Sequence, residues 1–272
     1  MSYYTVELFG ITFNLNPVAF TIPGINWQVY WYGILIAFGF LCALVSGYIN
    51  SKKLDINFDK VVTAIYVVLP IAILSARLYY IIFDPYSTIK DFFNFSNHGF
   101  SGLAIYGGVI GGFLFALWYC KKYHIYFLEA CDLFAPILPF FHIFGRIGCF
   151  LAGCCYGIPA SWGFMYPHET FTRLPLPLIE AVCNLVILTT LLLFEKYCSP
   201  RGYHLPFYGI LYGITRFVLE FFRGDSARGV WLLSTSQWIS IAVVLGSVIW
   251  TIWNAKRLEK LKQYYLHISI SD

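Results

Sequence analysis

Long apolar stretches, separated by short polar or basic ones, run along most of this chain. A helix of about 20 mainly apolar residues crosses a bilayer, and stretches of roughly that length recur here. We expect seven membrane-spanning helices, over residues 27–50, 61–83, 102–122, 131–153, 177–194, 205–222 and 234–253. The pattern therefore predicts an all-α polytopic membrane protein.

The composition supports this class of protein. Hydrophobic residues make up 59% of the 272 residues and charged residues only 12%, whereas a soluble domain carries about 25% charged residues. The net charge of +4 is spread over short loops, so it favours membrane orientation over a nucleic-acid partner. The sequence shows neither an internal repeat nor a second domain, and we expect one integral membrane domain over residues 1–272.

The two ends of the chain are expected to lie outside the helical region. Residues 1–26 are predicted to form a hairpin or an interfacial, periplasmic segment, because Pro17 and Pro23 argue against a long helix. Residues 27–253 hold the helices and loops, and residues 254–272 are expected to be a cytoplasmic tail. A cleavable signal peptide is not expected, since a basic region followed by an apolar core is missing from the first 20 residues.

The basic residues predict the orientation of the helices. Loops assigned to the inside carry Lys52, Lys53, Lys60, Lys121, Lys122, Lys196, Arg201, Lys256, Arg257, Lys260 and Lys262. Loops assigned to the outside carry only Lys90, Arg173, Arg223 and Arg228. Lysine and arginine concentrate on the cytoplasmic side of membrane proteins, so we expect the N-terminus outside and the C-terminus in the cytoplasm.

One apolar helix contains a charged residue that needs an explanation. Residues 142–157 read HIFGRIGCFLAGCCYG and place Arg146 in the continuation of an apolar helix. An arginine at the centre of a membrane helix costs about 2.5–3.5 kcal/mol on insertion scales. Arg146 therefore needs a partner carboxylate, a water-filled cavity or an anionic ligand. The four glycines of this stretch allow close approach of other backbone.

Further charged residues lie within or at the edge of the expected spans. Arg77, Arg146 and Arg216 fall on three different spans, and Glu180 and Glu220 can lie at the same level. Arg216 and Glu220 are four residues apart, on one helix face. The arginines outnumber these carboxylates, so we expect at least one arginine without a carboxylate partner. Arginine suits bidentate phosphate binding, which indicates a phospholipid head group as the missing anion.

Histidine and cysteine side chains surround Arg146. His142 lies four residues before it and serves either as a proton carrier or as a residue that links helices. Cys149, Cys154 and Cys155 could form a thiol centre, and a redox pair of Cys149 with either of the others stays open. No metal and no cofactor is expected, because a fourth ligand is missing locally and adjacent cysteines fit one tetrahedral ion poorly.

A glycine-rich stretch in the third span predicts tight helix packing. Gly107-Gly108 and Gly111-Gly112 form two pairs one helical turn apart. A phosphate-binding loop is the competing interpretation, but the Gly-Lys-Ser/Thr of a Walker motif does not follow. We therefore expect this helix to contact a neighbour through its glycines.

Taken in order, the motifs resemble those of bacterial prolipoprotein diacylglyceryl transferases over nearly the whole chain. The matching elements are WYG at residues 31–33, ARL at 76–78, GLAIYGGVIGG at 102–112, DLFAPILPF at 132–140, GRIG with a closing glycine at 145–157, PLPLIE at 175–180, YGITRFVLEFFRGD at 212–225 and SQW at 236–238. The combination of the GRIG and RFxxEFFR elements is specific, so the chain is identified as a divergent member of that family.

The resemblance implies an activity and a set of site residues. Such enzymes transfer the diacylglyceryl group of phosphatidylglycerol to the lipobox cysteine in the signal peptide of a preprolipoprotein, within the bacterial inner membrane. This implies catalytic roles for Arg146, Arg216, Tyr106 and Glu220. The expected substrate-binding residues are Tyr32, Arg77, Gly157 and His142.

Four positions depart from the family's usual residues. Tyr106 replaces a histidine, Cys149 and Ala152 replace asparagines, and Cys154 replaces a glutamate. Tyrosine is a poor base, with an ordinary pKa of about 10. One hypothesis is the same reaction with another proton acceptor, and a second is a changed, thiol-based reaction. Serine at all three cysteines would abolish the second activity and largely spare the first. A third hypothesis is a non-catalytic phospholipid-binding membrane protein.

Overall fold

The computed structural model describes residues 4–8, 11–24, 27–53, 56–83, 105–165, 169–198, 202–224, 229–230 and 232–271. The chain forms two compact units, each described here by itself. The first unit combines residues 1–46 with residues 134–272, and the second consists of residues 47–133.

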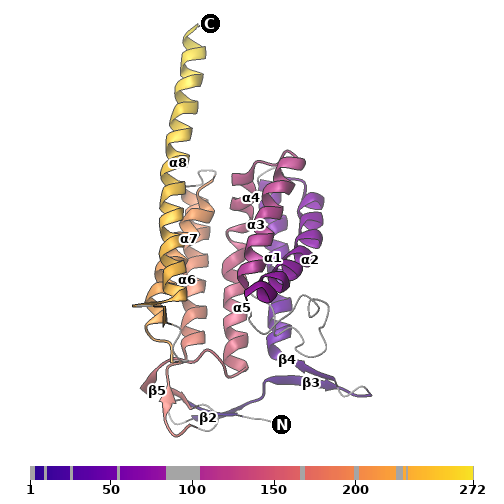
Figure 1. The fold of residues 1–272 in the computed structure, drawn as a ribbon, viewed down its shortest axis with the longest axis vertical. Coiled ribbons are helices and arrows are strands. Elements are labelled where there is room, and N and C mark those ends of the chain that lie inside the picture. The colour runs from indigo at the N-terminus through magenta and orange to yellow at the C-terminus, as the bar shows by residue number, and fades with distance from the viewer. Residues whose placement is uncertain are drawn as a thin grey trace. The chain divides into compact units, whose positions relative to one another are not determined.

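Helices account for most of the described residues (Figure 1). They are α1 (Trp31–Lys53), α2 (Phe58–Phe83), α3 (Ile105–Lys122), α4 (Phe127–Phe134), α5 (Ile137–Leu151), α6 (Leu176–Tyr197), α7 (His204–Glu220) and α8 (Thr235–Ser271). Every predicted span coincides with a helix or, for residues 131–153, with the pair α4 and α5. The apolar pattern of the sequence therefore located the helices correctly.

The lengths and composition of these helices are those of a polytopic membrane protein. Among the described residues, five stretches are long and apolar enough to cross a membrane: Trp31–Lys53, Phe58–Ile82, Phe127–Leu151, Leu176–Tyr197 and Thr235–Lys260. Seven spans, and the direction in which they cross, stay predictions.

Three boundaries differ from those expected. The stretch from Trp27 to Tyr30 is a strand, so the first helix begins only at Trp31. The helix expected over residues 131–153 is divided at Pro136 into α4 and α5, because proline lacks the N–H that would continue the helical hydrogen bonds. At the other end, α8 runs on to Ser271, so most of the expected tail is helical.

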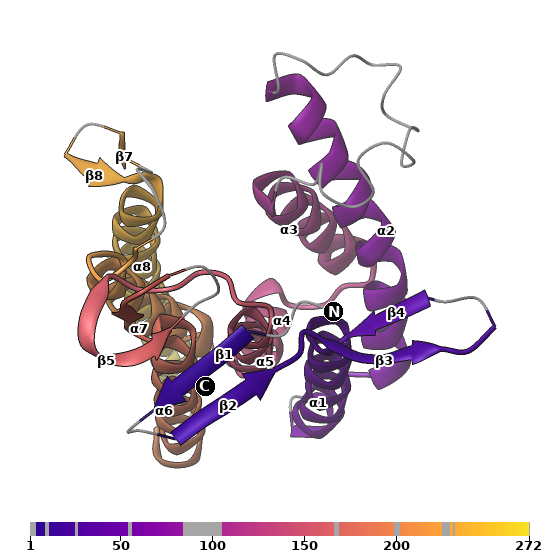
Figure 2. The same ribbon diagram turned by 90° about the horizontal axis from the view of Figure 1, so that it is seen from below.

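Short antiparallel hairpins correct the all-α expectation. The strands are β1 (Tyr4–Leu8), β2 (Ile11–Leu15), β3 (Val18–Ile22), β4 (Trp27–Tyr30), β5 (Pro159–Met165), β6 (Thr172–Arg173), β7 (Gly229–Val230) and β8 (Leu233–Ser234). Each pairs with its neighbour in sequence, in four two-stranded sheets. The expected N-terminal hairpin is confirmed by β1 and β2, which lie beside β5 (Figure 2).

Within the first unit, α5, α6, α7 and α8 pack in chain order, each against the next (Figure 1). Small residues make these contacts close. A Cβ added at Gly213 of α7 would lie 2.6 Å from Cγ2 of Val244 in α8. The first part of α1 packs on α5, where the rings of Phe38 and Phe144 meet edge to face at 4.9 Å. This packing brings the polar positions of α5, α6 and α7 together.

The second unit confirms the packing role of the glycine pairs. Gly107, Gly108 and Gly111 of α3 lie against α2, and a Cβ at Gly107 would stand 2.9 Å from Cα of Ala76. Tyr119 also ties these helices, since its hydroxyl donates a hydrogen bond to the Lys60 carbonyl at 2.8 Å. The glycines serve helix contact here, as expected.

Candidate active site

Two arginines from different helices share one carboxylate inside the first unit. Arg146 of α5 forms an ion pair through Nε with Oε2 of Glu180 on α6. Arg216 of α7 donates a hydrogen bond through Nη1 to Oε1 of the same carboxylate at 2.6 Å. Glu180 is only 5% exposed, so both of its oxygens are used in a nearly dry environment. The carboxylate therefore fixes two guanidinium groups from facing helices.

A second carboxylate holds the other side of Arg216. Its Nη2 donates to Oε2 of Glu220 at 2.6 Å and to the hydroxyl of Ser236, at the start of α8, at 3.4 Å. The i,i+4 spacing of Arg216 and Glu220 predicted this pair, and it is confirmed. With bonds on both sides of its planar group, Arg216 has little freedom to reorient.

The four charges balance one another. A buried ion costs several kcal/mol unless it is paired and hydrogen-bonded, and here two arginines face two glutamates. Arg146 and Arg216 both have carboxylate partners, because Glu180 serves both, and the expectation that at least one of the three arginines lacks one stays a prediction. An approaching anion therefore meets arginines that are already oriented and neutralised.

His142 links α5 to α7. Its Nδ1 lies 2.9 Å from the hydroxyl of Tyr208, and its ring stacks on Tyr212 at 4.5 Å between centroids. The sequence leaves two roles open for His142, as a proton carrier or as a residue that links helices. These contacts favour the second role. They also set the spacing of the helices that carry Arg146 and Arg216. Its role in substrate binding stays a prediction.

Tyr32 reaches the same end of α5 from the first turn of α1. A Cβ added at Gly148 would lie 2.7 Å from Cδ2 of Tyr32, so only glycine lets the ring lie there. The phenol is close enough to Arg146 and Cys149 to interact with them electrostatically. Tyr32 is half exposed, which leaves part of the ring available for contact with a substrate.

Gly157 lies where three backbone segments meet. Its N–H donates to the Leu174 carbonyl at 3.0 Å, and its own carbonyl accepts from Nη1 of Arg173 at 3.3 Å. A Cβ here would stand 2.7 Å from Cβ of Leu174 and 3.0 Å from the Phe222 carbonyl oxygen. Close backbone packing accounts for this glycine, and its role in substrate binding stays a prediction.

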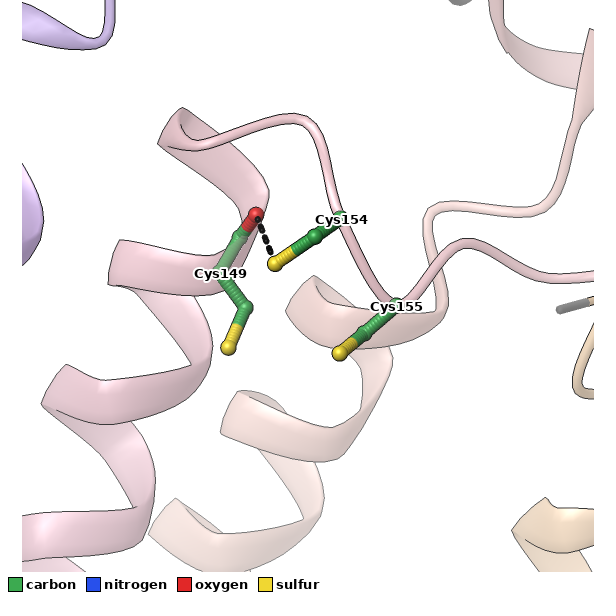
Figure 3. A group of neighbouring side chains, drawn as sticks. All are labelled: Cys149, Cys154 and Cys155. Atoms are coloured by element: carbon green, nitrogen blue, oxygen red, sulfur yellow. Dashed lines mark hydrogen bonds between the residues drawn. The ribbon is translucent and has the colours of Figure 1, made fainter. Parts of the chain in front are cut away.

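The three cysteines of the predicted thiol centre do come together. Figure 3 shows their side chains turned into one space beside the last turns of α5. The Sγ atoms of Cys149, Cys154 and Cys155 all lie within 4.8 Å of one another. Cys154 also donates a hydrogen bond to the Cys149 carbonyl at 3.5 Å. The pKa of Cys155 lies below its ordinary value, because the Cys149 and Cys154 thiols hydrogen-bond its thiolate.

The remaining predicted site residues belong to the second unit. Arg77 is buried in α2, where its guanidinium lies 5.8 Å from the ring centroid of Tyr80. Tyr106 is in the first turn of α3, and its side chain lies outside the described residues. The roles expected for both residues stay predictions.

Sequence reasoning missed several members of this cluster. The sequence predicts Glu180 as a carboxylate that can lie level with Glu220, but it does not predict the bridge to both arginines. The sequence assigns no role to Ser236 or to Tyr208. The SQW element at residues 236–238 is a motif that could have pointed to Ser236. Neither hydropathy nor spacing distinguishes Tyr208 from the other tyrosines of α7.

Known proteins resemble this chain over most of its length. The family description "Prolipoprotein diacylglyceryl transferase" matches residues 17–253. A phosphatidylglycerol–prolipoprotein diacylglyceryl transferase of Clostridium tetani is 34% identical, over 90% of this chain and 100% of the relative. A relative of the same name from Clostridioides difficile is 32% identical, over 89% of this chain and 97% of the relative. This chain therefore belongs to the prolipoprotein diacylglyceryl transferase family.

Proposed function

We propose that this protein transfers the diacylglyceryl group of phosphatidylglycerol to the lipobox cysteine of preprolipoproteins, the first step of lipoprotein maturation. In this reaction the cysteine sulfur forms a bond to a lipid carbon, and the bond from that carbon to a phosphate oxygen breaks. The electron pair leaves with glycerol phosphate, and the thiol proton must be removed. The protein is thus a transferase that needs an anion site and a means to deprotonate a thiol.

The observation that carries this proposal is the pair of arginines held by Glu180. A leaving phosphate gains negative charge in the transition state, and oriented donors stabilise that charge without reorganising. Arg146 uses Nε toward Glu180 and also hydrogen-bonds Tyr212, while the remaining N–H donors of its guanidinium suit phosphate oxygens. Arg216 is fixed on two sides by Glu180 and Glu220. We assign phosphate binding and stabilisation of the leaving group to the two arginines.

The other site residues have supporting roles in this proposal. Glu220 orients Arg216, and His142 spaces the two helices that carry the arginines. Tyr32 and Gly157 complete the substrate site within the first unit, and the roles expected of Tyr106 and Arg77 stay predictions. The surroundings of Tyr32, half exposed beside Arg146, suit the glycerol part of a lipid head group.

The membrane setting follows from the substrates. We place the protein in the bacterial inner membrane with seven spans, by adding α3 and α7 to the five long apolar stretches. The N-terminus faces outward and the C-terminus faces the cytoplasm, in line with the basic residues at the ends of α1, α3 and α6. In this orientation the arginine cluster lies toward the outer leaflet, where a lipobox cysteine arrives on its signal peptide.

The test is a transfer assay with the purified protein, phosphatidylglycerol and a lipobox peptide, with the peptide weighed by mass spectrometry. The wild type is expected to add one diacylglyceryl group to the cysteine. Arg146→Ala should reduce the rate by at least about 100-fold, as for removal of one oriented donor. Arg257→Ala, on the far part of α8, is the matched control and should keep the wild-type rate.

Two results would overturn the assignment. Full activity of the Arg146→Ala variant would show that Arg146 is not part of the active site. Phospholipid binding without any product in the wild type would favour the non-catalytic lipid-binding protein, and the assay should include a binding measurement for this reason.

A further inference from the structure

We propose that Cys149, Cys154 and Cys155 bind one divalent, thiophilic metal ion of the zinc type, whose fourth ligand is the lipobox thiol of the acceptor. This inference rests on the proposed transferase function and names how the acceptor thiol is activated. It departs from the sequence-based expectation of no metal, which rested on the missing fourth ligand and on the poor fit of adjacent cysteines to one tetrahedral ion.

The positions of the three sulfur atoms suit one ion. Each Sγ lies within 4.8 Å of the other two. Zinc–sulfur bonds of about 2.3 Å place the sulfurs of a tetrahedral site about 3.8 Å apart. The longest separation here must therefore shorten by only about 1 Å, which side-chain rotation can supply.

The backbone explains how two adjacent cysteines share one space. In an extended chain, neighbouring side chains point to opposite sides. Here Gly153 and Cys155 both adopt left-handed conformations, with φ of 67° and 59°. A residue with a Cβ rarely adopts this conformation, and such strain concentrates at functional sites. The resulting turn directs the Cys154 and Cys155 thiols toward that of Cys149 (Figure 3).

The number of ligands indicates an open site. Among the residues that the structure describes, the group of mutually close metal-ligating atoms at this place consists of the three thiols. Structural zinc sites have four protein ligands, whereas catalytic ones have three and leave the fourth position to water or substrate. Cys154 is exposed beyond the end of α5, so an incoming thiol has access to the cluster.

The thiols lie next to the residues proposed to bind phosphate. Cys149 follows Arg146 by three positions in α5, almost one helical turn, so both side chains project from one face. Tyr32 interacts electrostatically with Arg146 and with all three thiols. The acceptor sulfur and the lipid phosphate would thus meet at the same end of α5, as a displacement at the intervening carbon requires.

The chemistry of such a site matches the reaction. The acceptor thiol loses its proton to water when it binds the ion, because a coordinated thiol is deprotonated at neutral pH. The bound thiolate then attacks the lipid carbon, and the new sulfur–carbon bond replaces the carbon–oxygen bond to phosphate. Glycerol phosphate leaves with the electron pair. The product thioether is neutral and a weaker ligand than thiolate, so it departs and water or the next acceptor thiol replaces it.

This inference joins two features that the sequence left apart. Tyr106, which the sequence offers as a catalytic residue, has a phenol that is a poor base at neutral pH. Cys149, Cys154 and Cys155 are offered separately, as a thiol centre. A metal that deprotonates the acceptor thiol removes the need for a basic side chain.

Metal binding is tested with Co²⁺ as the probe, because cobalt thiolates absorb strongly in the ultraviolet and visible. The metal-free, reduced wild type should bind one Co²⁺ with thiolate bands. The variant with serine at Cys149, Cys154 and Cys155 should bind it at least about 100-fold more weakly. Cys198→Ser, an exposed cysteine at the end of α6, is the matched control and should bind as the wild type does. Circular dichroism checks that both variants are folded.

Equal Co²⁺ binding by the wild type and the triple-serine variant would overturn the metal site. So would a disulfide within the cluster that forms in air and that excess Zn²⁺ does not prevent, since that result assigns the thiols to redox chemistry.

The acceptor is tested with two peptides that differ in one atom. A lipobox peptide with cysteine should change the Co²⁺ spectrum as its sulfur enters the coordination shell, and the same peptide with serine should not. An unchanged spectrum with the cysteine peptide would limit the ion to a structural role and overturn the inference.

Failure of this inference can be told from failure of the proposed function. Chelation of the metal should stop transfer to the peptide, and Zn²⁺ should restore it. Full transfer by the metal-free protein would leave the function standing and refute the metal. Absence of transfer by the Zn²⁺-loaded protein, together with a spectrum that responds to the cysteine peptide, would refute the function and leave the site standing.

Discussion

Tyr32 and Gly148 lie so close that one added carbon atom would collide with the ring: a Cβ on Gly148 would stand 2.7 Å from Cδ2 of Tyr32. This contact joins α1 to the end of α5 that carries Arg146 and Cys149. It is therefore a point where packing determines the position of functional groups.

Gly148→Ala should destabilise the protein and displace Tyr32. Overpacking of this kind costs about 1–3 kcal/mol, which should appear as a lower unfolding temperature in detergent. Gly145→Ala is the matched control, because a Cβ there would meet its nearest neighbour, Cδ1 of Ile36, at an ordinary 3.6 Å.

The double variant Gly148→Ala with Tyr32→Ala should regain part of the lost stability, since the smaller residue removes the clash. If the two losses simply added, the ring would not be the group that the new methyl meets.

Glu180→Gln should weaken both the fold and the reaction. Glutamine keeps the size of the side chain but leaves two partly buried arginines with one carboxylate, Glu220. Removal of one partner from a buried ion pair costs about 3–5 kcal/mol, and the retained amide oxygen should reduce that loss. Thermal unfolding and the transfer assay measure the two effects. An unchanged unfolding temperature would show that the bridge contributes nothing to stability.

Arg216→Lys should lower kcat far more than it raises the KM for phosphatidylglycerol. Lysine keeps the charge but cannot bond Glu180 and Glu220 at once through a planar fork. Loss of one preorganised donor typically costs about 100-fold to 1,000-fold in kcat. Steady-state kinetics over a range of lipid concentrations separates the two constants. A rise in KM with unchanged kcat would assign Arg216 to ground-state binding alone.

Tyr106→Phe should keep transfer within a few-fold of the wild-type rate. A phenol with an ordinary pKa of about 10 is largely protonated at neutral pH and removes protons poorly. The rate should therefore survive loss of the hydroxyl, provided that the thiol is deprotonated by other means. A general base contributes about 100-fold to 10,000-fold, so a loss in that range would identify Tyr106 as the base.

The sequence predicted the helices well because their signals are local. Apolar length located the helices, and the i,i+4 spacing revealed the pair of Arg216 and Glu220. The strand at Trp27–Tyr30 was missed because aromatic residues at an interface suit a strand as well as the start of a helix. The continuation of α8 was missed because its polar end lacks the apolar pattern used to recognise spans.

The site was predicted only in part because its contacts are not local. Glu180 is 34 residues from Arg146 and 36 from Arg216, and the rotation of three helices decides whether they meet. The turn at Cys155 depends on a left-handed backbone conformation. In the sequence, only a nearby glycine points to a turn here. Such features arise from tertiary packing, so they cannot be predicted from the spacing of residues in the sequence.

The bridge made by Glu180 has a consequence for the choice of lipid. Because the carboxylate takes Nε of Arg146 and Nη1 of Arg216, an anionic head group meets only the N–H groups that the bridge leaves over. A neutral lipid with the same two acyl chains has no charge to offer those groups. The bridge would thus fix the direction from which a phosphate is bound, and this discriminates between donors by head group before any chemistry begins.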